Sequence, residues 1–357
     1  MDGGCITSTN TSNCSDVLQD FQVGMSWALW TKQVLTPIIV AAGIVGNILS
    51  FIVMSSRPLR HKSYSFYLRA LAVFDSLTLI SREVLAVEEI HISYGKPSIY
   101  SNFGDISCKT MRFAESVSCL MSSWLVAFMA VERFVAIYFP LRKTFYCTRK
   151  RALVAIVCLF NALCCCQFYN LVMFEHARGH CTVKREYFML YLNIYTYLYL
   201  LVMILLLPVM LIVFCNGMVV CKLFRYRQIP CNHADSESEK TAWVTQRRHK
   251  TTYMLITITS AYIVTVLPIT LCSVIIQVTI ESKPRAEAER IFMAFEPYKH
   301  LLEIWSALNY SVNFFIYIVS GKMFRRELKH VLTRRTSGNG SGVKTRSTHL
   351  KEEIQLT

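Results

Sequence analysis

Residues 108–134 read CKTMRFAESVSCLMSSWLVAFMAVERF, an apolar helical stretch that begins with a cysteine and ends with an acid, an arginine and a phenylalanine. Charged groups at membrane depth cost a few kcal/mol or more each, so they face a bundle interior or a watery cavity. Glu115 and Arg133 are eighteen residues apart, which is five helical turns and roughly 27 Å along one face. Ser122 lies about 20° from that line. The stretch therefore predicts an inward helix face with an acid near one membrane surface, a hydroxyl at mid-depth and an arginine near the other.

The composition of the whole chain indicates a membrane protein with several spans. Of its 357 residues, 53% are hydrophobic and only 17% are charged, which is unusual for a soluble domain. The excess of 38 Lys and Arg over 23 Asp and Glu lies in short loops between apolar stretches, where basic residues set membrane orientation. This placement argues against nucleic acid as a partner. No phosphate loop, nucleophile elbow or zinc-ligand spacing is present in the sequence, so we do not expect an enzyme.

Seven apolar stretches are long enough to cross roughly 30 Å of hydrocarbon. They are expected near residues 34–54, 66–88, 108–134, 152–174, 188–220, 252–280 and 298–319. The loops after the first, third and fifth are basic, and the others are acidic or balanced. The positive-inside rule then places the N-terminus outside the plasma membrane and the C-terminus in the cytoplasm. The predicted fold class is an all-α, seven-helix transmembrane bundle with a short amphipathic eighth helix.

Four parts of the chain follow from this pattern. Residues 1–33 form an extracellular tail and residues 34–320 form the seven-helix domain. Residues 321–333 alternate apolar residues and cations and are expected to lie on the lipids of the inner leaflet. Residues 334–357 are polar and are expected to be a disordered cytoplasmic tail with phosphorylation sites.

The predicted outer side has two kinds of covalent feature. Cys108 begins the third stretch and Cys181 lies in the next extracellular loop, so a disulfide between them suits the oxidising side of the membrane. Asn10 and Asn13 each begin a glycosylation sequon in the tail. Both features depend on the predicted topology.

The order of short motifs resembles a known family. The motifs are Gly43-Ile-Val-Gly46-Asn47, Leu71-Ala-Val-Phe-Asp75, Cys108, Glu132-Arg133-Phe134, Pro208, Pro268 and Asn313-Phe-Phe-Ile-Tyr317. Over residues 34 to about 332 the chain resembles a rhodopsin-like (class A) G-protein-coupled receptor. The segments SVNFFIYIVSGKMFRREL and SYSFYLRALAVFDSLTL are most similar to invertebrate neuropeptide receptors of the FMRFamide-like and thyrotropin-releasing-hormone-like groups. The resemblance implies an extracellular ligand and a heterotrimeric G protein, with arrestin and a receptor kinase as further partners.

The resemblance also implies which residues support activation. These are Glu132, Arg133, Phe134, Pro268, Asn313 and Tyr317. The chain departs from the family pattern at Val266, Asn216 and Phe314, where relatives usually carry a tryptophan, a tyrosine and a proline. Arg248 stands where some relatives have an acid that restrains the arginine of the third helix, so we expect Glu132 to restrain Arg133 instead.

Four residues match an interior sodium site of the family, namely Asp75, Ser122, Asn309 and Asn313. Hard oxygen ligands around a carboxylate suit Na⁺ chemically. The alternative is a plain hydrogen-bonded polar cluster without an ion. Apart from this ion, no cofactor is expected.

The predicted ligand site centres on two acids, Glu115 and Glu303. Glu115 matches the position of the amine-binding aspartate in amine receptors, and Glu303 faces inward at a similar outer depth. Two acids in one cavity favour a cationic ligand group. The alternative is that Arg112 and Arg82 neutralise them in internal pairs.

The remaining outer residues favour a peptide as the ligand. The outer residues include charged and ionisable groups such as His300, and the fifth stretch carries Tyr191, Tyr195, Tyr197 and Tyr199. These tyrosines could equally be an aromatic belt at the membrane interface. We therefore expect a peptide receptor that activates a G protein. The alternatives are a chemosensory or amine receptor of the same fold and, outside the class, a transporter or channel.

Overall fold

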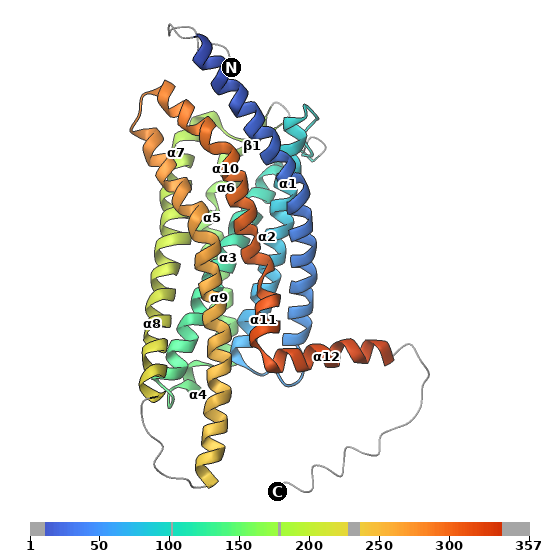
Figure 1. Cartoon of the computed structure of the whole chain (residues 1–357), viewed down its shortest axis with the longest axis vertical. Coiled ribbons are helices and arrows are strands. Elements are labelled where there is room, and N and C mark those ends of the chain that lie inside the picture. Colours follow the sequence, from blue (N-terminus) through green and yellow to red (C-terminus); the bar gives the residue numbers. More distant parts are fainter. Residues whose placement is uncertain (1–10, 101–102, 178–179, 228–235, 338–357) are drawn as a thin grey trace.

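Helices follow all seven apolar stretches in a computed structural model of the chain, and they lie side by side along one axis (Figure 1). The structure describes residues 11–100, 103–177, 180–227 and 236–337, without the side chains of 11–25, 143–144, 226–227, 236–252, 285 and 334–337. The helices of the seven stretches are α1 (Thr11–Met54), α2 (Ser63–Ser93), α3 (Gly104–Tyr138), α5 (Arg149–Gln167) with α6 (Tyr169–Met173), α7 (Phe188–Asn193) with η2 (Ile194–Leu206) and α8 (Leu207–Arg227), α9 (Ser236–Glu281), and α10 (Arg285–Ser311) with α11 (Asn313–Ser320). The predicted all-α bundle is confirmed.

By composition, five of these segments are long and apolar enough to cross a membrane: 26–54, 104–138, 149–173, 185–225 and 253–281. The other two, α2 and α10, carry charged side chains along their length. These charges make the two helices less apolar than their neighbours, and several of them line the interior cavity described below.

Several details differ from the expected helices. Helices α9 and α10 begin at Ser236 and Arg285, before the expected residues 252 and 298, and helix α12 (Lys322–Ser337) ends within the expected disordered tail. Helix α1 begins at Thr11, so residues 11–33, assigned to the tail, are helical. Residues 194–206 of the fifth stretch form the π-helix η2, which the sequence did not predict. The π-helix ends just before Pro208, whose missing N–H interrupts the ladder of backbone hydrogen bonds.

Short elements connect the long helices. The loop after α3 contains α4 (Lys143–Tyr146), and a 3₁₀ turn, η1 (Arg185–Tyr187), precedes α7. Strands β1 (Phe174–Ala177) and β2 (His180–Val183) form an antiparallel hairpin in which His176 pairs with Cys181. A disulfide joins Cys108 at the start of α3 to Cys181 in β2, with 5.5 Å between their Cα atoms, as expected.

Small residues bring α1 close to its neighbours. A Cβ atom on Gly43 would lie 2.5 Å from Cδ1 of Leu79 and 2.8 Å from Cβ of Ser311, so only glycine fits there. One turn later, Asn47 donates a hydrogen bond of 3.0 Å to the carbonyl of Tyr310. This motif is therefore a packing seam between α1, α2 and α10.

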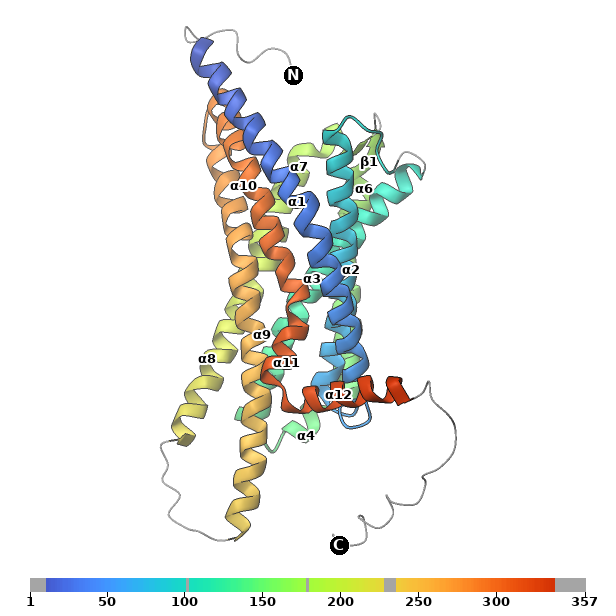
Figure 2. The ribbon, with the colours of Figure 1, turned by 45° about the vertical axis from the view of Figure 1, so that its right-hand side comes forward.

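Helix α12 (Lys322–Ser337) follows α11 directly and lies across the end of the bundle (Figure 2). Its Phe324 is buried against Tyr317 and Phe314, whereas Arg325 and Arg326 are exposed. The expected amphipathic eighth helix is therefore present, with its apolar face toward the bundle.

Candidate functional site

A cavity of about 610 Å³ opens between α1, α2, α3, η2, α9 and α10. Basic residues on its wall are Lys32, Arg82, Arg112 and Lys299. Acidic residues on its wall are Glu88, Glu89, Glu115, Glu296 and Glu303. Both acids predicted to bind a ligand cation thus line one cavity, together with both arginines named as their alternative partners.

Glu115 lies beside Arg82. The Nε atom of Arg82 is 4.0 Å from Oε1 of Glu115, and its NH1 group donates a hydrogen bond of 2.7 Å to Ser306. The guanidinium also lies over the ring of Tyr310, 5.1 Å from its centroid. Arg82 is thus held by α3 and α10 together, and Glu115 faces a cation of the protein itself.

Arg112 does not pair with Glu115 among the described residues. Its guanidinium lies over the ring of Phe174 in β1, 5.4 Å from the centroid. Its Nε is buried and has no hydrogen-bond partner among the described residues. Of the two arginines in that alternative, Arg82 and not Arg112 therefore lies beside Glu115. Side chains one turn apart on a helix can contact each other, but the guanidinium of Arg112 instead contacts Phe174 of the hairpin.

Glu303 is held by Lys32, a residue that was not predicted to belong to the site. Oε2 of Glu303 accepts a hydrogen bond of 2.8 Å from Nζ of Lys32, and the same ammonium contacts Oε2 of Glu89 and lies 3.3 Å from Nδ1 of His300. The sequence pattern places Lys32 in the tail. A signal was present, because Lys32 is the single charge within the apolar residues 26–54.

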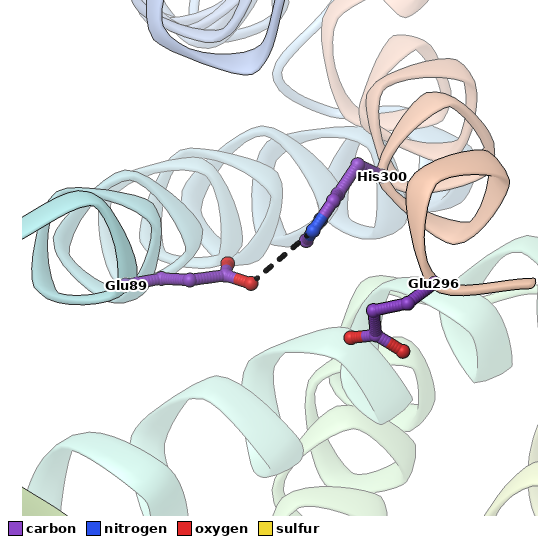
Figure 3. Close-up of side chains that lie close together, drawn as sticks. All are labelled: Glu89, Glu296 and His300. Atoms are coloured by element: carbon purple, nitrogen blue, oxygen red, sulfur yellow. Dashed lines mark ion pairs between the residues drawn. The ribbon is translucent and has the colours of Figure 1, made fainter. Parts of the chain in front are cut away.

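Glu89, Glu296 and His300 lie close together, as Figure 3 shows, and both acids line the cavity. Each offers one ligand atom, and these atoms lie within 4.8 Å of one another, as in a metal site. However, Lys32 contacts Glu89, and Nζ of Lys299 lies 2.8 Å from Oε1 of Glu296. Since each carboxylate already has an ammonium partner, we interpret this group as an ion-pair network.

Three of the predicted tyrosines form one wall of the cavity. The rings of Tyr191 and Tyr195 stack at 5.7 Å between centroids, and those of Tyr195 and Tyr199 at 5.3 Å. Tyr197 instead donates a hydrogen bond of 2.6 Å to Glu281. The three stacked rings belong to the interior of the bundle and not to an interfacial belt.

The four residues of the predicted sodium site lie together at the centre of the bundle. Ser122 donates a hydrogen bond of 2.5 Å to Oδ1 of Asp75, and Asn313 donates one of 2.7 Å to Oδ2. Asn309 lies one turn before Asn313 and contacts Thr265, with 3.4 Å between its Oδ1 and the hydroxyl oxygen. All of these side chains are buried. The donor set of one carboxylate, hydroxyls and amides fits a hard monovalent cation.

Arg133 is not paired with Glu132 in the described part of the chain. Its guanidinium lies over the ring of Tyr64 in α2, 4.8 Å from the centroid, while its Nε and NH2 are buried without a hydrogen-bond partner there. The ring of Phe134 instead stacks on Tyr138, with 4.8 Å between the ring centroids. No ion pair between Glu132 and Arg133 is therefore present among the described residues, because adjacent residues leave a helix in different directions. The restraint of Arg133 by Glu132 stays a prediction.

Other activation residues fall between the helices. Asn216 donates a hydrogen bond of 2.6 Å to Thr259 and links α8 to α9. Tyr317 is buried against Phe324, 5.3 Å between ring centroids. Pro268 lies inside α9, which continues through it.

Four predicted features lie outside the described residues or side chains. These are Asn10, the side chain of Asn13, the side chain of Arg248, and residues 338–357 of the predicted tail. Nothing in the structure bears on glycosylation or on the charge facing Arg133 from this part of α9.

The bundle, the hairpin tied to α3 and the interior polar cluster agree with a sequence match to one family. Residues 46–317 match the model of the 7 transmembrane receptor of the rhodopsin family. The chain therefore belongs to this family and is a multi-pass membrane receptor, not an enzyme.

Individual relatives are similar to this chain at low identity. The FMRFamide receptor of Drosophila melanogaster is 24% identical over 343 residues, which cover 88% of this chain and 56% of that protein. A probable G-protein coupled receptor of Caenorhabditis elegans is 34% identical over 125 residues, or 35% of this chain and 29% of that protein. The human growth hormone secretagogue receptor type 1 is 30% identical over 140 residues, or 38% of this chain and 36% of that protein. The chain thus spans about a third to a half of the length of these relatives.

Proposed function

We propose that the chain is a peptide receptor that activates a heterotrimeric G protein. The cavity carries the peptide part of this proposal, because it presents charges of both signs at two places, Arg82 with Glu115 and Lys32 with Glu303. A small monoamine has one cation to pair, whereas a peptide offers several charged and hydrogen-bonding groups. The similarity to a receptor named for FMRFamide supports the same choice.

The inner end of the bundle supports the G-protein part. Arg133 has buried N–H groups without hydrogen-bond partners among the described residues, and such groups cost free energy until a partner satisfies them. We propose that a G protein binds beside Glu132, Arg133 and Phe134, on the cytoplasmic side. The N-terminus and the hairpin then face outward, which antibody access to terminal tags on intact cells would test.

The decisive experiment is a screen of amidated peptides on cells that express the receptor, with calcium and cyclic-AMP readouts. We expect responses from the wild type and none from Arg133→Ala at equal surface expression. Small amines form a parallel arm, and responses to them alone would favour an amine receptor. Ion or solute flux without G-protein signalling would favour a transporter or channel.

Tyr64 should restrain the inactive receptor through its contact with Arg133. A cation over an aromatic ring contributes about 0.5 to 2 kcal/mol, so Tyr64→Leu should raise the ratio of active to inactive receptor roughly two- to thirtyfold. Ligand-free signalling measures this ratio at matched surface expression. Tyr94→Leu, the same change at an exposed position at the other end of α2, is the control. Unchanged basal signalling in Tyr64→Leu would place the restraint elsewhere.

We also propose that Asp75, Ser122, Asn309 and Asn313 bind Na⁺. An ion that binds only the folded receptor stabilises it by mass action. The unfolding midpoint of the purified wild type should therefore rise when choline is replaced by sodium at equal ionic strength, and this rise should disappear in Asp75→Asn. A wild type that is insensitive to sodium would favour the plain polar cluster.

A further inference from the structure

The ammonium group of Lys32 has a complete set of acceptors. It contacts Oε2 of Glu89 and lies 2.8 Å from Oε2 of Glu303 and 3.3 Å from Nδ1 of His300. A lysine ammonium has three N–H donors and no acceptor, so three acceptors from α2 and α10 match it one for one. The side chain of Lys32 is only 8% exposed. These three residues therefore form a site shaped for an ammonium, with a group of the protein already in it.

The two ring nitrogens of His300 can serve this role in one tautomer. If Nδ1 accepts from Lys32, the neutral imidazole carries its proton on Nε2, which lies 3.5 Å from Oε1 of Glu89. Figure 3 shows the carboxylate of Glu89 pointing toward this ring. The histidine can thus accept from an ammonium on one side while Glu89 fixes it on the other.

The charges at this end of the cavity are not balanced. Three carboxylates, Glu89, Glu296 and Glu303, meet two ammonium groups, Lys32 and Lys299, which leaves one negative charge. The side chains of Glu89 and Glu303 are 38% and 34% exposed, and both line the cavity. A second cation that enters the cavity can therefore reach Glu303 without leaving Lys32 unpaired, because Glu89 remains.

We propose that Glu303, His300 and Glu89 form an ammonium-binding subsite, which Lys32 fills in the free receptor and in which a primary ammonium of the ligand takes its place at Glu303 and His300, while Lys32 keeps Glu89. The flexible four-carbon stem of lysine allows Lys32 to turn toward Glu89 when this happens. The ligand group is a peptide amino terminus or a lysine side chain, and this part rests on the proposed peptide function. Acceptors that converge on one point suit a compact ammonium better than the planar fork of a guanidinium.

The subsite also separates the two acids of the cavity. Glu115 faces the guanidinium of Arg82, which is fixed by Ser306 and Tyr310 and has little freedom to move. Glu303 faces a flexible lysine. Exchange of one cation for another is therefore expected at Glu303.

The test replaces Lys32 and returns its ammonium as a small molecule. Lys32→Ala removes three methylenes and the ammonium, which n-propylammonium supplies again. We expect n-propylammonium to raise the unfolding midpoint of purified Lys32→Ala receptor in a saturable way, by about 2 to 4 °C. The neutral n-propanol and tetramethylammonium, which lacks N–H donors, should have no such effect.

Two variants serve as controls. Lys109→Ala removes a lysine that pairs with Asp105 away from the cavity, and it should not respond to n-propylammonium. Adding Glu303→Gln to Lys32→Ala should abolish the response. If Lys32→Ala does not fold, Lys32→Met keeps the stem and leaves only the place of the ammonium empty, so that NH₄⁺ becomes the probe.

The results with the ammonium probes test the subsite independently of whether peptides activate the receptor. A folded Lys32 variant that does not respond to its ammonium probe, or that responds equally to n-propanol, would overturn the subsite even if peptides activate the receptor. For a peptide that activates the wild type, acetylation of its amino groups should lower potency by about 30-fold or more. Potency unchanged by acetylation would overturn the exchange with the ligand.

Discussion

Replacement of Glu303 by glutamine should lower the potency of an activating cationic peptide by roughly 30-fold to a few thousand-fold. Loss of one partner of a desolvated charged contact costs about 2 to 5 kcal/mol, and each 1.4 kcal/mol is a factor of ten. Glutamine keeps the shape of the side chain but removes the charge that holds Lys32 at 2.8 Å. The measurement is a concentration–response curve at matched surface expression.

Glu115→Gln should also reduce potency if Glu115 binds the ligand. Its effect should be smaller than that of Glu303→Gln, because Arg82 already faces this acid. Glu287→Gln is the matched control, since Glu287 lies on the same helix as Glu303 but pairs with Lys283 and is half exposed. If Glu115→Gln and Glu303→Gln both reach the surface and leave potency unchanged, the two acids are structural.

Removal of the disulfide should destabilise the receptor by about 2 to 4 kcal/mol. The bond between Cys108 and Cys181 closes a segment of 73 residues, and cross-links of long segments restrict the unfolded chain most. Helices that stay in the membrane also restrict the unfolded chain. The destabilisation should therefore not exceed this range, although the closed segment is long. The double variant Cys108→Ser, Cys181→Ser should therefore have a lower unfolding midpoint than the wild type.

The same variant should bind ligand more weakly, because the hairpin contributes to the cavity. Cys181 lines it, and Phe174 in β1 packs against Arg112 and Tyr191. The control is Cys165→Ser with Cys166→Ser, two free and exposed cysteines on α5. Equal midpoints for both double variants, or peptide mapping that finds Cys108 and Cys181 free in the wild type, would contradict the prediction.

Most of the fold could be predicted from the sequence, because the length and apolar character of each stretch determine it. The stretches of the seven helices and the amphipathic α12 depend on local patterns. The π-helix η2 could not be predicted, since its residues are as apolar as those of an ordinary spanning helix. Only the hydrogen bonds of the folded chain distinguish the two.

The site was predicted less completely, because its contacts join residues far apart in the chain. Lys32 meets Glu303 across 271 positions, and no periodic pattern reports such a pair. Glu132 and Arg133 show the opposite case, since these neighbours in sequence form no ion pair among the described residues. The interior cluster at Asp75 was found because the resemblance named its members.

The hydrogen bonds of Asp75 have a consequence for how the receptor responds to graded amounts of ligand. Ser122 of α3 and Asn313 of α11 each occupy one carboxylate oxygen, so α2, α3 and α11 meet at a single buried group. A small rotation of α11 alone would leave one oxygen without a partner at a cost of about 1 to 3 kcal/mol. Intermediate rotations are therefore sparsely populated, and each molecule changes between discrete arrangements. The height of a dose–response curve would then report the fraction of molecules that have switched. Fluorescence of single receptors at half-maximal ligand should show two distinct intensity levels, and not one level that shifts gradually with ligand concentration.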